Sequence, residues 1–100
     1  MKQTLLASLL AAAGLLAVAP AGAQVSDDVV RIGVMNDMSG PYVEIAGPGS
    51  VLAARMAVAD YLEATGSNLK VDVISADHQN KPDVGASIAR KWFDVDGVDM

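Results

Sequence analysis

VVRIGVMNDMSGPYVEIAGPG, residues 29–49, contains the transition that decides the fold. Its first part, Val29–Met35, is almost continuously apolar, which is typical of a strand buried on both faces. Residues of the Asn, Asp, Ser, Gly and Pro types then punctuate Asn36–Gly49, and this pattern predicts a loop. An alanine-rich stretch with the apolar spacing of a helix follows. The sequence therefore predicts a strand that leads through a long loop into a helix.

The rest of the chain repeats this order of elements. We predict a helix over Ser50–Thr65, capped by Ser50, then a strand over Lys70–Ala76 and a second helix over Pro82–Asp94. A third strand is expected to begin at Val98. The residues expected to face the core are Val51, Ala54, Val58, Tyr61 and Leu62 in the first helix, and Val84, Ile88, Trp92 and Val95 in the second. The order strand, helix, strand, helix, strand predicts an α/β fold with a parallel sheet and right-handed crossovers.

The first 23 residues have the composition of a secretory signal peptide. Lys2 supplies a positive start, Leu5–Val18 is apolar, and Ala21-Gly22-Ala23 forms an A-x-A cleavage site. The apolar run is shorter than the roughly 20 residues that a membrane-spanning helix needs, which disfavours the alternative of an uncleaved anchor. We therefore expect residues 1–23 to be a signal peptide and residues 24–100 to be the mature segment.

Charge and cysteine content exclude several classes of protein. The net charge is −5, and loss of Lys2 makes the mature segment more acidic, so binding to nucleic acid is disfavoured. The chain has no Cys, which removes disulfides and thiolate chemistry.

Asp96–Met100 looks like a turn into a further strand. We therefore expect this sequence to be the N-terminal part of a longer protein.

Two polar loops follow the predicted strands, at the edge where parallel α/β sheets bind ligands. The first, Asn36–Gly49, is longer than the roughly 2–6 residues usual between a strand and a helix. It lacks both G-x-G-x-x-G and the P-loop pattern and contains no Lys or Arg, which argues against a phosphate ligand. The loop either forms a shaped binding surface or merely turns the chain at its Gly-Pro pairs. The second loop, Asp77–Pro82, contains the single histidine, His78.

Catalytic and metal-binding patterns are weak. Ser39, His78 and Asp37 or Asp77 supply the residue types of a nucleophilic triad, but no G-x-S-x-G elbow is present. The same histidine and carboxylates have little specificity as a metal site. The alternative for His78 is a solvated or hydrogen-bonded loop residue. Tyr42 either contacts a ligand or folds onto the neighbouring helix.

Two segments resemble the start of a known family: VVRIGVMNDMSGPYVEIAGPGSVLAARMAVAD, residues 29–60, and VDVISADHQNKPDVGASIARKWFDVDGVD, residues 71–99. The turn G-V-x-x-x-S-G-P-Y, the following G-P-G, the loop D-H-Q-N-K-P and the later A-R-K-W resemble periplasmic solute-binding proteins of the branched-chain amino acid (leucine-binding) type. The resemblance implies a type I periplasmic-binding-protein-like α/β fold, of which this chain supplies the start of the first lobe. Two such lobes close over a ligand between them.

The resemblance also implies a function and a set of ligand-binding residues. It implies a periplasmic substrate-binding protein of an ABC importer, which delivers an amino acid or a related amide or aromatic carboxylate to the membrane subunits. No enzymatic activity, cofactor or metal is implied, and nucleic acid is not a partner. The residues that line the cleft by this resemblance are Asp37, Ser39, Gly40, Pro41 and Tyr42 in the turn, Ile45, Ala46 and Gly47 on its far side, and His78 and Gln79 at the cleft edge. The alternatives are a sensory receptor module of the same fold and a doubly wound α/β hydrolase that uses Asp37 and His78.

Overall fold

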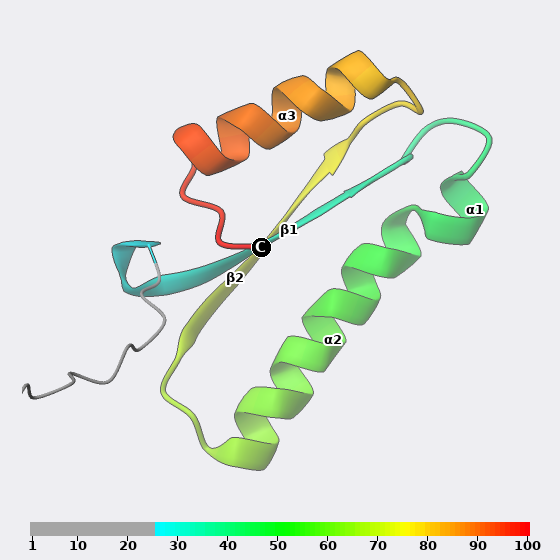
Figure 1. The fold of residues 1–100 in the computed structure, drawn as a ribbon. Helices are drawn as coiled ribbons and strands as arrows, with labels where there is room; N and C mark the ends of the chain where they lie inside the picture. Colours follow the sequence, from blue (N-terminus) through cyan, green and yellow to red (C-terminus); the bar gives the residue numbers. More distant parts are fainter. Residues whose placement is uncertain (1–25) are drawn as a thin grey trace, which may run out of the picture.

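The computed structural model describes residues 26–100, which form two strands flanked by helices (Figure 1). The elements, in chain order, are a 3-10 turn η1 (Ser26–Asp28), β1 (Val29–Asn36), α1 (Val43–Ala46), α2 (Pro48–Thr65), β2 (Lys70–Asp77) and α3 (Pro82–Asp94). Both predicted strands and both predicted long helices are confirmed. The predicted signal peptide, residues 1–23, lies outside the described residues. No helix within residues 26–100 is long and apolar enough to cross a membrane.

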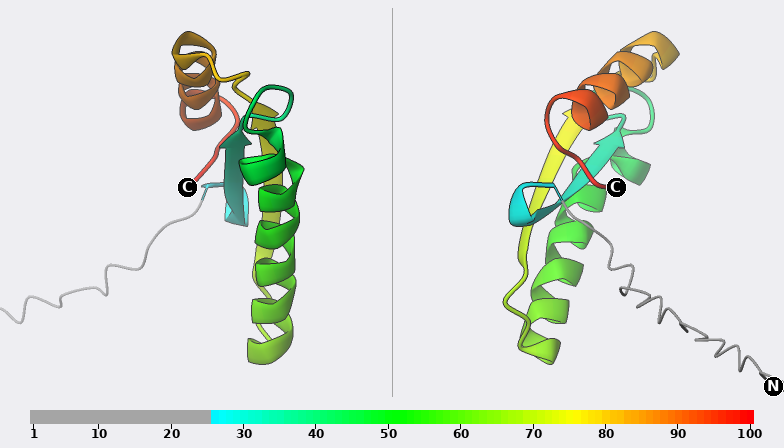
Figure 2. Two further views of the ribbon diagram at one scale, coloured as in Figure 1. Left: turned by 90° about the vertical axis from the view of Figure 1, so that its right-hand side faces the viewer. Right: turned by 60° about the vertical axis from the view of Figure 1, so that its left-hand side comes forward.

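The two strands run parallel and pair along their whole length. The register runs from Val29 opposite Lys70 to Asn36 opposite Asp77, so both strands end at the same edge. The helices α2 and α3 cover opposite faces of this sheet (Figure 2). This arrangement is the α/β architecture that the sequence predicts, and it brings the loops after β1 and β2 together at the carboxyl edge.

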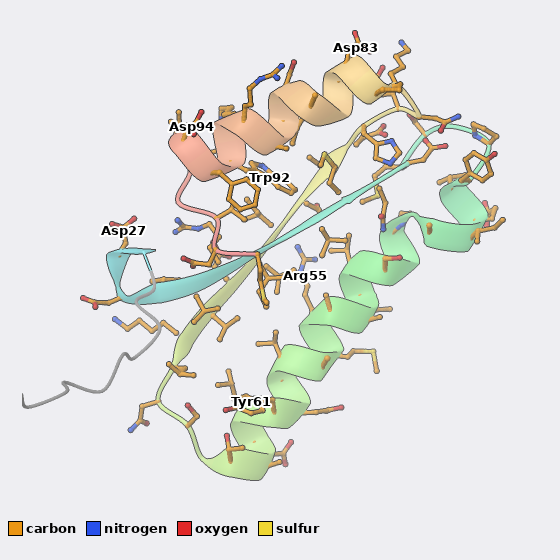
Figure 3. All side chains as sticks on the ribbon, viewed as in Figure 1. Asp27, Arg55, Tyr61, Asp83, Trp92 and Asp94 are labelled. Atoms are coloured by element: carbon orange, nitrogen blue, oxygen red, sulfur yellow. The ribbon has the colours of Figure 1, made fainter. Side chains whose placement is uncertain are left out.

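The contact between α3 and β1 depends on one small residue. Trp92 is buried, with 8% of its surface exposed, and projects from α3 toward the strands (Figure 3). A Cβ atom placed on Gly33 would lie 2.6 Å from Cε3 of Trp92. Only glycine therefore lets the indole ring lie directly against the β1 backbone. This close approach sets the position of α3 over the sheet.

The opposite face packs against α2 through small and branched residues. Val51, near the start of α2, is buried, with 7% of its surface exposed. Farther along, an apolar groove of about 370 Å³ separates the helix from the sheet. Val30 and Ile32 of β1 line it on one side, and Ala54 and Val58 of α2 line it on the other. α2 therefore packs most tightly against the sheet at its N-terminal end, which follows residues 37–47.

The segment after α3 runs beside β1, but it is not a strand within the described residues. Asp99 N donates to Arg31 O at 2.9 Å, and Gly33 N donates to Met100 O at 2.7 Å. Backbone groups of successive strand residues point to alternate edges, and Asn36 O accepts from His78 N on the β2 side. The odd-numbered residues of β1 therefore face the other edge. The expected third strand is not formed, but residues 99–100 lie along this edge, with β1 between them and β2.

Four details of the sequence prediction are wrong. The first helix begins at Pro48, two residues early, and Ser50 does not cap it, since its N-cap is Gly47. A short helix, α1, forms inside the segment predicted as a loop. Two residues expected in the core stripes are exposed: Tyr61, with 54% of its surface accessible, and Val95, with 74%. Val95 follows the last residue of α3 and has left the helical backbone conformation, so its side chain no longer follows the stripe.

Candidate functional site

The candidate site lies at the carboxyl edge of the sheet, where residues 37–47 follow β1 and residues 78–81 follow β2. Figure 1 shows these two connections side by side at one end of the strands. Two aspartates, one at or just beyond the end of each strand, organise both connections. Their contacts determine which groups remain available to a ligand.

Asp37 shapes the first connection from inside. It is buried, with 2% of its surface exposed, although it is a carboxylate. Gly40 N donates to Asp37 Oδ1 at 2.7 Å, Ser39 N to the same oxygen at 3.3 Å, and Tyr42 N to Oδ2 at 3.0 Å. A Cβ atom on Gly40 would lie 2.7 Å from Asp37 Oδ1, so the chain can wrap around this carboxylate only with glycine there. The buried charge is thus satisfied by the loop backbone.

Asp77, the last residue of β2, joins the two connections. Its Oδ2 accepts the hydroxyl hydrogen bond of Ser39 at 2.6 Å. Its Oδ1 accepts from Met38 N at 3.0 Å and from Gln79 N at 2.7 Å. One carboxylate therefore binds the backbone and a side chain of the first connection and also closes an Asx-type turn in the second.

These contacts lower the pKa of both aspartates. Burial by itself raises the pKa of Asp37, but the N–H groups of Tyr42, Gly40 and Ser39 favour the ionised form and bring the pKa below 3.8. The negative charge of Asp77 opposes this effect. The Ser39 hydroxyl is the main cause of the lowered pKa of Asp77, with the Met38 N–H next. Desolvation acts against it, while the Gln79 N–H and the charge of His78 add to it. Both groups are therefore ionised at neutral pH.

The short helix α1 carries the exposed apolar surface of the site. Tyr42 precedes it with 52% of its surface exposed, and Ile45 within it is 82% exposed. Ile45 N and Ala46 N both donate to Tyr42 O at 3.0 Å, and Gly47 N donates to Val43 O at 3.0 Å. The backbone is thus hydrogen bonded while the two large side chains face outward.

The second connection is a tight turn. Lys81 N donates to His78 O at 2.9 Å, and the two central residues, Gln79 and Asn80, have φ values of 55° and 56°. Asn80 N donates to His78 Nδ1 at 2.9 Å, so this ring nitrogen accepts a hydrogen bond from its own turn. A hollow of about 200 Å³ lies against His78, Lys81 and Gly85.

The ten predicted ligand-binding residues are brought to one edge, but they differ in accessibility. Ser39, Pro41, Tyr42, Ile45 and Gln79 are exposed, Gly40, Ala46 and His78 are partly exposed, and Asp37 and Gly47 are buried. Asp37 has its carboxylate committed to the backbone and acts on the shape of the loop. Ligand contact by any of the ten stays a prediction.

The residues of the alternative catalytic and metal hypotheses are arranged for other contacts. Ser39 Oγ donates to Asp77, and Nδ1 of His78 accepts from Asn80 N in its own turn. Within residues 26–100, no three His, Cys, Asp or Glu side chains are grouped so that they could hold a metal ion. The geometry presents an ordered surface with exposed apolar side chains.

A parallel α/β unit with ordered loops at its carboxyl edge is the architecture of ligand-binding α/β proteins. The chain belongs to the periplasmic binding protein family, whose model matches residues 29–100. No match is found among curated proteins.

Two solved structures are similar to this chain. A periplasmic binding protein from Burkholderia mallei is 47% identical, with a TM-score of 0.65, over 72% of this chain and 19% of the other. A branched chain amino acid ABC transporter periplasmic ligand-binding protein from Burkholderia xenovorans is 48% identical, with a TM-score of 0.60, over 70% of this chain and 18% of the other. The chain thus spans about a fifth of the length of these two proteins.

The role of Asp77 as the link between the two connections was not predicted from the sequence. There Asp77 was only a candidate member of a weak triad or metal site. The local signal was present, because an Asp directly before a polar turn often accepts the N–H group two residues later. Its bond to Ser39, however, joins residues 38 positions apart, and no local pattern contains that information.

Proposed function

We propose that this chain forms part of the ligand-binding lobe of an extracytoplasmic solute receptor that serves an ABC importer. The solute is an amino acid or a related amide or aromatic carboxylate, bound in a cleft between two lobes and delivered to the membrane subunits. Residues 1–23 act as a cleavable signal peptide that directs the protein to the periplasm. The family match and the name of the Burkholderia xenovorans relative support this proposal.

The observation that carries the proposal is the exposed apolar pair on an ordered loop. Tyr42 and Ile45 are 52% and 82% exposed at the edge where α/β proteins bind ligands. Ligand pockets are lined mainly by apolar and aromatic side chains with a few polar groups, and these two residues supply such side chains at that edge. Tyr42 offers an aromatic ring and a hydroxyl, which suit a solute with both apolar and polar parts.

The test uses the protein as its gene encodes it, purified from the periplasm of expressing cells. Isothermal titration with L-leucine, acetamide and 4-hydroxybenzoate samples the three solute classes. Tyr42→Ala and Ile45→Ala should each weaken binding about 10- to 100-fold, because burial of a large side chain contributes about 1.5–3 kcal/mol. No binding by the wild type to any amino acid, amide or aromatic acid would refute the proposal.

Matched controls separate a local effect from a general one. Phe93→Ala removes an aromatic side chain that is 60% exposed near the far end of α3. Val95→Ala does the same for an aliphatic side chain that is 74% exposed. Neither change should alter the Kd. Uptake of the bound solute by intact cells, with and without the gene, then distinguishes an importer component from a sensory receptor.

A further inference from the structure

We propose that Asp77 is a positioning residue for the binding surface, which it fixes from the neighbouring strand without touching the solute. This inference rests on the proposed function, since it assigns to Asp77 control of the segment that carries Tyr42 and Ile45. Asp77 itself ends β2, and its oxygens are occupied by Met38, Ser39 and Gln79.

The hydrogen bonds of the two aspartates differ in how far apart in the sequence their partners lie. The three bonds to Asp37 come from Ser39, Gly40 and Tyr42, which lie two to five residues away, so they shape the loop locally. The bonds from Met38 and Ser39 to Asp77 span 39 and 38 residues. Asp37 thus gives the loop its form, and Asp77 gives it a fixed place relative to β2.

Within the described residues, these two bonds are the side-chain hydrogen bonds that tie residues 38–47 to β2 or its turn. The bond from His78 N to Asn36 O precedes this segment and extends the pairing of the strands. Without the Asp77 contacts, residues 38–47 would be held only by their chain connections to β1 and α2 and by side-chain packing. Its ordered backbone could then move as a unit relative to the cleft edge.

The hydrogen bond from Ser39 to Asp77 makes the attachment of residues 38–47 to β2 sensitive to small chemical changes. At 2.6 Å it is a short hydroxyl-to-carboxylate bond, the strong charge-assisted type. Asp77→Asn keeps one oxygen for Met38 and Gln79 but replaces the other acceptor with an NH₂ donor. Ser39→Ala removes the donor alone, and Ser39→Thr keeps a hydroxyl in the same place. Together these variants separate the bond from the bulk of the side chains.

The experiment measures solute affinity and backbone hydrogen exchange in the protein as its gene encodes it. The probe is the member of the L-leucine, acetamide and 4-hydroxybenzoate panel with the lowest wild-type Kd. Asp77→Asn and Ser39→Ala should weaken its binding about tenfold, because loss of one charge-assisted bond within the chain lowers the fraction of molecules in the binding arrangement, and should speed exchange across residues 38–47. Ser39→Thr should restore both properties. Asp72→Asn, an exposed aspartate on the same strand that pairs with Arg31, should change neither.

Wild-type affinity in folded Asp77→Asn, with the probe bound by the wild type, would overturn the inference. If the wild type binds no panel solute, hydrogen exchange tests the contacts of Asp77 independently of the proposed function. Faster exchange confined to residues 38–47 then supports positioning by Asp77, and unchanged exchange refutes it. Should Asp77→Asn fail to fold, the comparison of Ser39→Ala with Ser39→Thr decides the question in the same way.

Discussion

Gly33→Ala tests whether the contact between Trp92 and the β1 backbone holds α3 in place. The added Cβ would lie 2.6 Å from Cε3 and 3.2 Å from Cη2 of Trp92, whose ring is part of the buried core. Overpacking of this kind costs about 1–3 kcal/mol, whereas alanine is intrinsically better than glycine in a strand by about 0.5–1 kcal/mol. We therefore expect the free energy of unfolding to fall by about 1–2 kcal/mol.

Urea unfolding followed by far-UV circular dichroism measures this change, and a double-mutant cycle identifies its cause. In a Trp92→Leu background the ring is absent, so Gly33→Ala should be neutral or stabilise by about 0.5–1 kcal/mol. Gly49→Ala in α2 is the matched control, because its Cβ would meet no atom within 4 Å; it should stabilise. An equal cost of Gly33→Ala with and without the Trp92 ring would refute the reasoning.

Three further predictions concern charge and backbone strain. Because the pKa of Asp37 is lowered, the stability that its ionised carboxylate gives the fold is complete above the ordinary value of 3.8 and is lost as the pH falls through the lower folded value. Amide protection in residues 39–42, measured by hydrogen exchange, should therefore persist at roughly pH 5 and vanish only below 3.8. Gln79→Gly should raise the free energy of unfolding by about 0.5–1 kcal/mol in urea titrations, because Gln79 has a φ of 55°, which a side chain disfavours. Asp72→Asn should cost at most about 1 kcal/mol, as an exposed pair does. Arg31→Gln should cost more, because Arg31 Nη1 also donates to Asp96 O at 2.7 Å; an equal cost in thermal unfolding would contradict this.

The elements were predictable because their signals are local. The apolar run of β1 and the alternation in β2 placed both strands to within one residue at each end. The stripe of Val84, Ile88 and Trp92 correctly placed the buried face of α3, since a regular helix carries its period along its length. The prediction failed for Val95 because the helix ends at the preceding residue, Asp94.

The candidate site was predictable in place but less so in detail. The carboxyl edge follows from strand order alone, so the residues after β1 and β2 had to meet there. The α1 turn was missed because Gly and Pro on both sides of Val43–Ala46 read as loop. The burial of Asp37 was missed because its partners are backbone N–H groups, which every residue has and no side-chain pattern reveals.

The hydrogen bonds of the site explain how two carboxylates can lie together beside the exposed apolar side chains of Tyr42 and Ile45. Each is a charge that would repel the other, and the charge of Asp77 indeed acts to raise the pKa of Asp37. Each also accepts three hydrogen bonds, which more than offset the repulsion and the loss of water, so both pKa values remain low. All of these hydrogen bonds are made within the chain itself and use no group of a solute. Under the proposed function, the internal bonds hold residues 38–47 in one arrangement, so less of the free energy of contact with Tyr42 and Ile45 is offset by lost loop entropy.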